Sequence, residues 1–170
     1  MTILIEQASD LDCIESCRQI LVDVFHDELK LYGMQIPDKY EQISHYMQIL
    51  YADILVGTYR IVVPNCSCGM PIEETGFDIN KFSQENVCEM SRLAIIKEAR
   101  GKIIFNKIIF SACIVAKSYG ATTLLIEILP QNLHLFQRQG FEQIGEPIKD
   151  ITVRSINNKE SIVIPMQKHL

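Results

Sequence analysis

A long apolar helix between two apolar strands constrains the fold of this chain more than any other feature. The strands are predicted over residues 87–96 and 121–129, and the helix between them ends at Tyr119, just before Gly120. Apolar residues fall on nearly every side of this helix, so we expect it to be buried. A crossover helix of this kind joins parallel strands in a right-handed unit. The centre of the chain therefore predicts a parallel pair within an open, mixed α/β sheet, which binds ligands where its strands diverge.

The segment before this unit adds a strand, a helix and a hairpin. Residues 2–7 are predicted to form the first strand, and Ser9 is a suitable N-cap for an amphipathic helix that Gly33 ends. Residues 45–51 and 54–63 are two β-rich runs around a short turn, which is typical of an antiparallel hairpin.

The remaining segments complete the predicted element order. Residues 64–85 are rich in Pro, Gly, Asn and Cys and predict a long surface loop with one short helix. Another short helix begins near Pro130, and two final strands follow Gly140. The predicted order is β-α-β-β, loop, β-α-β-α-β-β.

Composition excludes several classes of protein. The chain has 170 residues, 48% of them hydrophobic, which suits one folded domain over residues 1–170. Its 16 Lys and Arg against 21 Asp and Glu give a net charge of −5, which argues against a nucleic-acid binder. No apolar run is long enough to span a bilayer, and the first residues lack the basic region of a signal peptide. We therefore expect a cytoplasmic protein without a membrane span.

The six cysteines support the same expectation. Cys13 and Cys17 lie one helical turn apart, and Cys88 and Cys113 lie in apolar stretches, so reduced thiols are expected rather than disulfides. The run Cys66-Ser67-Cys68 has neither nearby histidines nor a second cysteine pair, so no metal site is predicted there or elsewhere.

Two short motifs place charged residues within apolar strands. They are Gly57-Thr58-Tyr59-Arg60 and Glu89-Met90-Ser91-Arg92-Leu93-Ala94. On a regular strand Glu89 and Ser91 face one side of the sheet and Arg92 faces the other. Because an unpaired buried charge is strongly unfavourable, these charged residues need partners. The available partners are Arg18, Arg60, Asp38 and Glu41, so these charges form either a structural ion-pair network or a functional site.

The two motifs together resemble the GNAT superfamily of acyltransferases. Within it, the chain is similar to the branch of acyl-homoserine-lactone (autoinducer) synthases and N-acyl amino acid synthases. The likeness runs from about Phe25 to the C-terminus and includes Asp38-x-x-Glu41-x-x-Ser44-His45 before the hairpin and Gly140-Phe141 near the end. It implies an α/β fold of three layers, with a mixed, mostly antiparallel sheet that splays between its fourth and fifth strands, in a single GNAT-like domain.

Two departures from autoinducer synthases favour the N-acylating relatives. Autoinducer synthases carry tryptophan in the N-terminal region, and this chain has none. They also carry an arginine four residues before the position that matches Phe25, where this chain has Leu21.

The predicted donor loop departs from the superfamily in another way. GNAT enzymes hold the coenzyme A pyrophosphate with Arg/Gln-x-x-Gly-x-Gly/Ala, through backbone N–H groups at a helix start. Arg100-Gly101-Lys102 matches the first half, but Ile103 and Phe105 occupy the later small-residue positions. The phosphopantetheine of an acyl-carrier protein has one phosphodiester there and should tolerate these side chains better. Lys97 and Lys107 add to a basic cluster that only Glu98 opposes, which suits an acidic carrier protein.

The resemblance implies roles for several strand residues. A backbone N–H near Leu93 or Ala94 would bind the thioester carbonyl, and Ile95 with the Arg100–Lys102 loop would bind the phosphopantetheine. Glu89 is the candidate general base, and Arg60 and Arg92 would support it as a charge network. Alternatively, Glu89 only pairs with one of these arginines. An amine attacks the thioester directly, and no tightly bound cofactor is required.

Phe25 and His45 are candidates for the acceptor side, although His45 is also compatible with an ordinary half-buried position. Phe136 stands where many acetyltransferases have a tyrosine that protonates the leaving thiol, and His134 is a weaker candidate for that role.

The sequence thus predicts an N-acyltransferase that moves a medium or long acyl chain from a thioester, expected on an acyl-carrier protein, to an amine. The acceptor is an amino acid or a lysine or ornithine side chain in a peptide. The alternatives are an autoinducer synthase, a short-chain acetyltransferase that uses acetyl-CoA, and a catalytically silent acyl-binding module.

Overall fold

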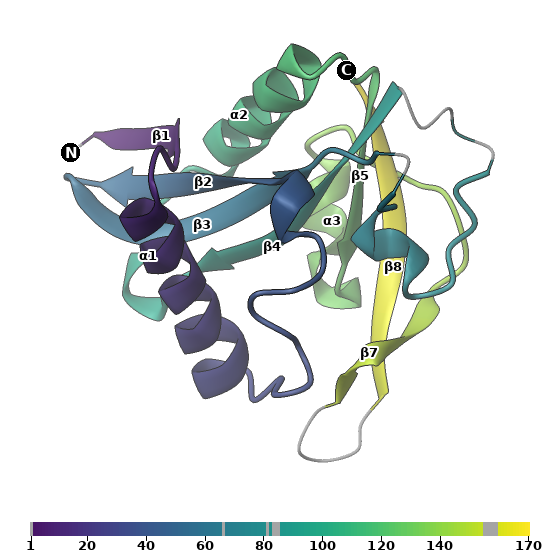
Figure 1. Cartoon of the computed structure of the whole chain (residues 1–170), viewed down its shortest axis with the longest axis horizontal. Coiled ribbons are helices and arrows are strands. Elements are labelled where there is room, and N and C mark those ends of the chain that lie inside the picture. Colours follow the sequence, from purple (N-terminus) through teal and green to yellow (C-terminus); the bar gives the residue numbers. More distant parts are fainter. Residues whose placement is uncertain (1, 66, 81, 83–85, 155–159) are drawn as a thin grey trace.

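The computed structural model describes residues 2–65, 67–80, 82, 86–154 and 160–170. It contains one eight-stranded sheet with helices on both faces (Figure 1). The strands are β1 (Ile3–Gln7), β2 (Ser44–Tyr51), β3 (Ile54–Val62), β4 (Val87–Ile95), β5 (Thr123–Ile128), β6 (Glu142–Gln143), β7 (Ile148–Arg154) and β8 (Glu160–His169). The sheet order is β1-β2-β3-β4-β5-β8-β6, with β7 paired to β8. One more strand is present at the end of the chain than the sequence predicts.

The β4–β5 pair is parallel, and the other pairs are antiparallel. Its pairing covers only Val87–Glu89 with Thr123–Leu125, after which the two strands separate. The predicted mixed, mostly antiparallel sheet that splays between β4 and β5 is therefore confirmed. The opening lies beside the second half of the Glu89–Ala94 motif.

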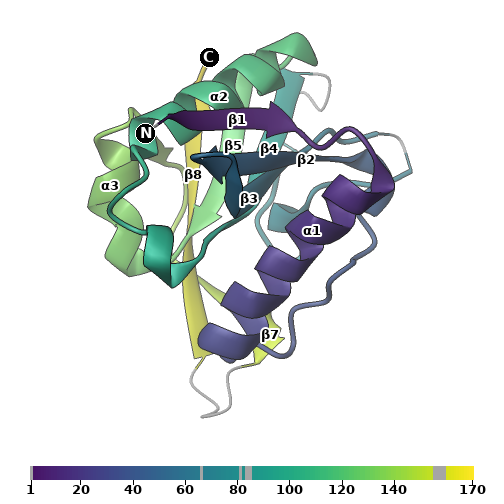
Figure 2. The ribbon, with the colours of Figure 1, turned by 90° about the vertical axis from the view of Figure 1, so that its left-hand side faces the viewer.

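The helices are α1 (Leu11–Leu21), α2 (Phe105–Ser118) and α3 (Leu133–Gln137), with a π-helical segment η1 (Val22–Glu28) after α1. Short 3-10 turns are η2 (Glu41–Ile43), η3 (Pro71–Glu73), η5 (Lys97–Ala99) and η6 (Pro130–Asn132). Figures 1 and 2 show α1 and α2 on opposite faces of the sheet. None of the helices in the described part of the chain is long and apolar enough to cross a membrane.

The first helix differs from its prediction at both ends. Asp10, not Ser9, is the N-cap, and its carboxylate accepts from the backbone N–H of Cys13 at 2.8 Å. The helix then continues as the wider π-helical segment η1, which ends at Glu28 and not at the predicted Gly33. The widened turns of η1 carry Phe25 toward the cavity described below.

Two burial predictions are wrong. The segment after β3 is not a surface loop, because Met70, Ile72, Phe77 and Ile79 form a small core with Val87 and Leu125. Helix α2 is not buried on nearly every side: Ile108 and Ala112 face the core, but Phe110 is 69% exposed and Ile114 51% exposed. Only one face of a helix can contact one face of a sheet, whatever the residues on its outer side.

Candidate active site

Strand β4 carries an extra residue where the sheet opens. Thr58 pairs with Ala94 and Arg60 pairs with Ser91, so β4 has one residue more than β3 between these pairs. Arg92 adopts a positive φ of 55° there, as expected for a β-bulge. The regular alternation predicted for residues 89–94 is therefore wrong. The bulge lets Ser91, Arg92 and Leu93 line the same cavity as Glu89.

The Gly-Thr-x-Arg motif on β3 fits this irregular strand. A Cβ on Gly57 would lie 2.7 Å from the carbonyl oxygen of Ala94, so only glycine permits the close approach of β3 to β4. The Thr58 hydroxyl donates to the carbonyl of Met47 at 2.9 Å. The Arg60 side chain is 1% exposed, and its Nε donates to the Ser91 hydroxyl at 2.8 Å.

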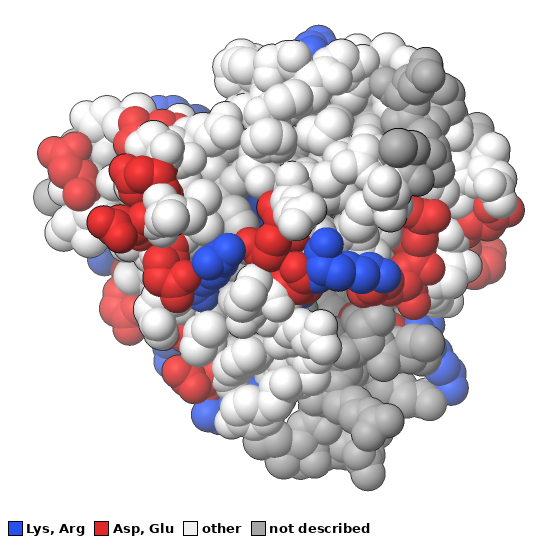
Figure 3. Space-filling view, viewed as in Figure 1, with Lys and Arg blue, Asp and Glu red and all other residues white. Residues whose placement is uncertain are grey.

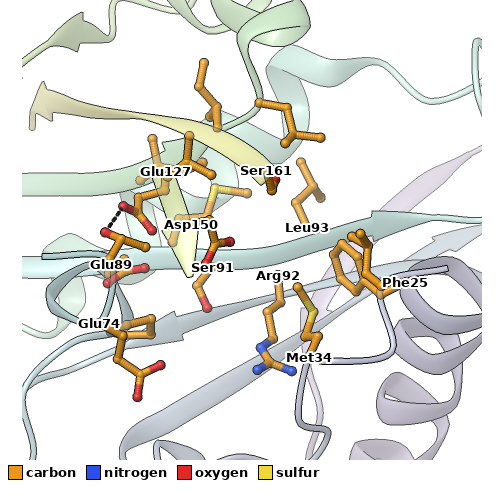
Figure 4. Close-up of a pocket in the computed structure, with 18 of the residues that line it drawn as sticks. Phe25, Met34, Glu74, Glu89, Ser91, Arg92, Leu93, Glu127, Asp150 and Ser161 are labelled. Carbon is orange, nitrogen blue, oxygen red and sulfur yellow. Dashed lines mark hydrogen bonds between the residues drawn. The ribbon is translucent and has the colours of Figure 1, made fainter. Parts of the chain in front are cut away.

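A cavity of about 650 Å³ lies along the opening between β4 and β5. Figure 4 shows carboxyl groups at one side of it and large apolar side chains at the other. The polar lining includes Asp38, Glu74, Glu89, Ser91, Arg92, Glu127, Asp150 and Ser161, and the apolar lining includes Phe25, Leu29, Leu31, Met34, Leu93, Ile128, Leu129 and Phe136. Its size and mixed lining are typical of a small-molecule site.

Glu89 lies at the polar side of this cavity and is 2% exposed. Its Oε2 accepts from the backbone N–H of Ile72 at 2.9 Å. Burial, and after it the nearby carboxyl of Glu127, raise the pKa of Glu89 well above its usual value. No ion pair joins Glu89 to Arg60 or Arg92 among the residues that the structure describes, so the predicted structural pairing is wrong.

Both arginines instead bind Asp38. Arg60 contacts its two carboxylate oxygens at 2.8 and 2.6 Å, and Arg92 contacts Oδ2 at 2.7 Å. Burial opposes the charge of Asp38, but the hydrogen bonds from Arg60 and the charges of both guanidiniums hold its pKa below the usual value. Glu41 lies 3.7 Å from Arg60 and pairs with Arg18 at 2.6 Å. The acidic segment before the hairpin thus anchors the arginines of the two motifs.

Glu127 is a second carboxyl in the site, partly buried, that the sequence reasoning did not place there. It lies on β5, and the Thr75 hydroxyl donates to its Oε1 at 2.5 Å. Burial raises the pKa of Glu127 to about 8. The available signal was a single charged residue within an otherwise apolar strand, because such a residue needs a specific reason to be buried.

The predicted donor loop has a partner that the sequence did not reveal. Arg100 binds both carboxylate oxygens of Glu28 at 2.5 and 2.6 Å, and its Nε donates to the carbonyl of Ile95 at 2.9 Å. Glu98 is therefore not the only acid that opposes the basic cluster. Lys102 and Gly101 are exposed, and neither lines the cavity.

The structure brings some of the remaining candidates together and separates others. Phe25 and Leu93 line the cavity, and Ala94 is buried beside it on β4. His45 does not reach the cavity: its ring stacks on Tyr119 with centroids 4.3 Å apart, and it hydrogen-bonds to the Tyr119 hydroxyl at 2.9 Å. Burial lowers the pKa of His45. His134 is exposed on α3 and does not line the cavity either.

Five cysteines, at positions 13, 17, 68, 88 and 113, are free thiols. Cys66 lies outside the described residues, so the Cys66-Ser67-Cys68 prediction is not addressed. Among the residues that the structure describes, no group of His, Cys, Asp or Glu is arranged to hold a metal ion.

The fold of this chain has counterparts among solved structures. FeeM, an N-acyl amino acid synthase from uncultured soil microbes, has a TM-score of 0.75 at 14% identity, over 99% of this chain and 91% of that chain. An acyl-CoA N-acyltransferase from Pseudomonas aeruginosa has a TM-score of 0.70 at 14% identity, over 98% of both chains. A GNAT family acetyltransferase from Elizabethkingia anophelis, with acetyl-CoA bound, has a TM-score of 0.65 at 16% identity. The match covers 99% of this chain and 98% of that chain. The fold is that of GNAT N-acyltransferases.

The amino-acid sequence assigns the chain to one family within the N-acyltransferases. Residues 36–155, more than half of the chain, match the family model of the N-acyl amino acid synthase FeeM. The chain belongs to that family, and it is an N-acyltransferase. No curated protein is significantly similar to it in sequence.

Proposed function

We propose that the enzyme transfers a medium or long acyl chain from an acyl-carrier-protein thioester to the amine of a free amino acid. The observation that carries this proposal is the single cavity along the opening of the sheet, which is acidic at one side and apolar at the other. An amine and a fatty acyl chain are the two groups that such a cavity would hold next to each other.

The acidic side would receive the acceptor. Its ammonium group would lie between Glu89 and Glu127, and Glu89 would take one proton, directly or through a water molecule. The nitrogen then attacks the thioester carbon, whose oxygen a backbone N–H near Leu93 or Ala94 would stabilise. The C–S bond breaks, and the departing thiolate takes the second proton from nitrogen, so no covalent enzyme intermediate is needed.

Arg92 would bind the carboxylate of an amino acid acceptor. Two buried guanidiniums, those of Arg60 and Arg92, share the single carboxylate of Asp38. Burial, and after it the Arg60 charge, lower the pKa of Arg92, whose guanidinium also donates to the backbone carbonyl of Gln35 at 2.5 Å. A second carboxylate would complete its pairing. A lysine or ornithine side chain in a peptide offers no carboxylate at that distance from its amine, so we favour the free amino acid.

The apolar side would receive the acyl chain. Phe25, Met34, Leu129 and Phe136 line it, and each methylene group that it buries contributes about 0.8 kcal/mol. An acetyl group would leave most of this surface without a ligand. The proposal of a carrier-protein donor rests on Ile103 and Phe105, which stand where coenzyme A enzymes have small residues.

The test uses short, medium and long acyl chains as donors, each carried on an acyl-carrier protein and on coenzyme A. The acceptors are free amino acids, their carboxamides, and lysine- or ornithine-containing peptides. Products are identified by mass spectrometry. We expect the highest kcat/KM for a long acyl carrier thioester and a free amino acid, and at least a tenfold higher KM for the matching carboxamide. Highest activity with acetyl-CoA, or a homoserine lactone product from S-adenosylmethionine, would overturn the proposal. Acyl binding without turnover of any thioester would leave only a binding module.

A further inference from the structure

The outer side of α2 presents apolar side chains to solvent between lysines. Phe110 is 69% exposed and Ile114 is 51% exposed, although Ile108 and Ala112 of the same helix are fully buried. Residues three, four or seven positions apart lie on one side of a helix. The residues Ile104, Lys107, Phe110, Ile114 and Lys117 therefore form one stripe, which we call the α2 outer face.

A groove continues this face toward the edge of the sheet. Besides α2 residues, it is lined by Ile3 and Ile5 of the edge strand β1 and by Lys168 and Leu170 near the end of the chain. Figure 2 shows β1 running beside α2 along this edge. The floor of the groove is largely apolar, and its lining contains three lysines, Lys107, Lys117 and Lys168, and one acid, Glu6.

The charge of this region differs from the charge of the whole chain. The chain has a net charge of −5, yet residues 99–126 contain one arginine, three lysines and no acidic residue. Arg100 is neutralised by Glu28, whereas Lys102, Lys107 and Lys117 make no ion pair with any residue that the structure describes. In Figure 3 the upper part of the molecule, over α2, shows no red atoms. Apolar and cationic groups together suit a partner that is acidic and amphipathic.

The start of α2 is connected to the cavity. Phe105, the first residue of α2, packs edge-on against Phe136 with ring centroids 5.1 Å apart. Phe136 in turn lines the apolar side of the cavity. A partner seated on the α2 outer face would therefore have one end near the apolar side of the cavity.

We propose that the α2 outer face, with its groove, is the docking surface for the acidic acyl-carrier protein. This inference rests on the proposed carrier-linked donor. The carrier would place an acidic helix over Lys107 and Lys117 and apolar side chains against Phe110 and Ile114. A second copy of the chain is a poorer occupant, because a two-fold contact would bring together two faces that carry the same positive charge.

The test compares two donors that carry the same dodecanoyl chain: a loaded bacterial acyl-carrier protein and dodecanoyl N-acetylcysteamine. The double variant Lys107→Glu with Lys117→Glu, and separately Phe110→Ser, should raise KM at least tenfold for the carrier-linked donor. Neither should change kcat/KM for the small thioester more than twofold. The matched controls are Lys30→Glu, on the opposite face of the sheet, and Leu11→Ser, which replaces a residue that is 78% exposed on α1. Both controls should leave the ratio between the two donors unchanged.

The possible outcomes separate this inference from the proposed function. If the carrier-linked donor is used well and the α2 variants use it equally well, only the docking surface is refuted. If the carrier-linked donor is no better than acyl-CoA, both proposals fail. Equal losses on both donors would also refute docking here, because they indicate damage to the site. Conversion of a wild-type dimer to a monomer by Phe110→Ser, or loss of binding to anionic vesicles in the double variant, would assign the face to a different partner and overturn the proposal.

Discussion

Replacing Glu127 by glutamine should change how the stability of the enzyme depends on pH. The substitution keeps the shape of the side chain and an oxygen that can accept from the Thr75 hydroxyl, but it removes the ionisable group. A carboxyl whose pKa is higher in the folded than in the unfolded protein destabilises the fold as pH rises between the two values. The pKa of Glu127 rises from 4.5 to about 8 on folding, so this group lowers the stability of the wild-type protein from about pH 4.5 to about pH 8.

The size of the effect follows from the same shift. At about 1.4 kcal/mol per pKa unit, Glu127 should cost the folded state on the order of 4 kcal/mol at pH 8. Below pH 4.5 the protonated carboxyl and the amide should be nearly equivalent. The free energy of unfolding of Glu127→Gln should therefore equal that of the wild type near pH 4 and exceed it by at least about 2 kcal/mol at pH 8.

Urea denaturation at a series of pH values measures this difference. The exposed Glu142→Gln, on β6, is the matched control and should follow the wild-type curve. A second readout is kinetic: because the Glu127 carboxyl raises the pKa of Glu89, the acid limb of the kcat profile should move to lower pH in Glu127→Gln. Wild-type and Glu127→Gln curves that run parallel from pH 4 to pH 8 would refute the raised pKa of Glu127.

Three further substitutions test the rest of the site. Glu89→Gln retains an acceptor for the Ile72 N–H but removes the base, so kcat should fall by about 100-fold or more; a change below about threefold in a folded variant would make Glu89 structural. Asp38→Asn leaves two buried guanidiniums without their shared carboxylate and should lower the free energy of unfolding by about 3–5 kcal/mol in denaturation; a loss below about 1 kcal/mol would contradict the assigned network. Gly57→Ala forces a Cβ to within 2.7 Å of the Ala94 carbonyl and should reduce both the melting temperature and kcat; wild-type values of both would show that the bulge tolerates the shift.

Local pattern determined much of the fold. The parallel pair was predicted from the apolar runs on either side of α2, and the hairpin from the two runs around the Ala52–Asp53 turn. These predictions succeed because the spacing of apolar residues along the chain distinguishes strands from helices. The Glu89–Ala94 and Gly57–Arg60 motifs pointed to the candidate site through their resemblance to GNAT acyltransferases, and both contribute residues to the cavity lining. Burial of α2 was overestimated, since hydrophobicity indicates which side chains prefer the interior but not how much of a helix the sheet can cover.

Pairing between distant residues was decided only by the tertiary structure. The sequence offered Asp38 and Glu41 as possible partners of the arginines, but only the folded chain shows that Arg60 and Arg92 share Asp38. It also leaves Glu89 beside Glu127, 38 positions away. The bulge at Arg92 likewise depends on the register between β3 and β4. The motifs therefore indicated the class of reaction, and the three-dimensional contacts decided which carboxyls have raised pKa values and which are paired with arginines. Electrostatic interactions depend on distance and burial, and neither quantity is contained in the local order of residues.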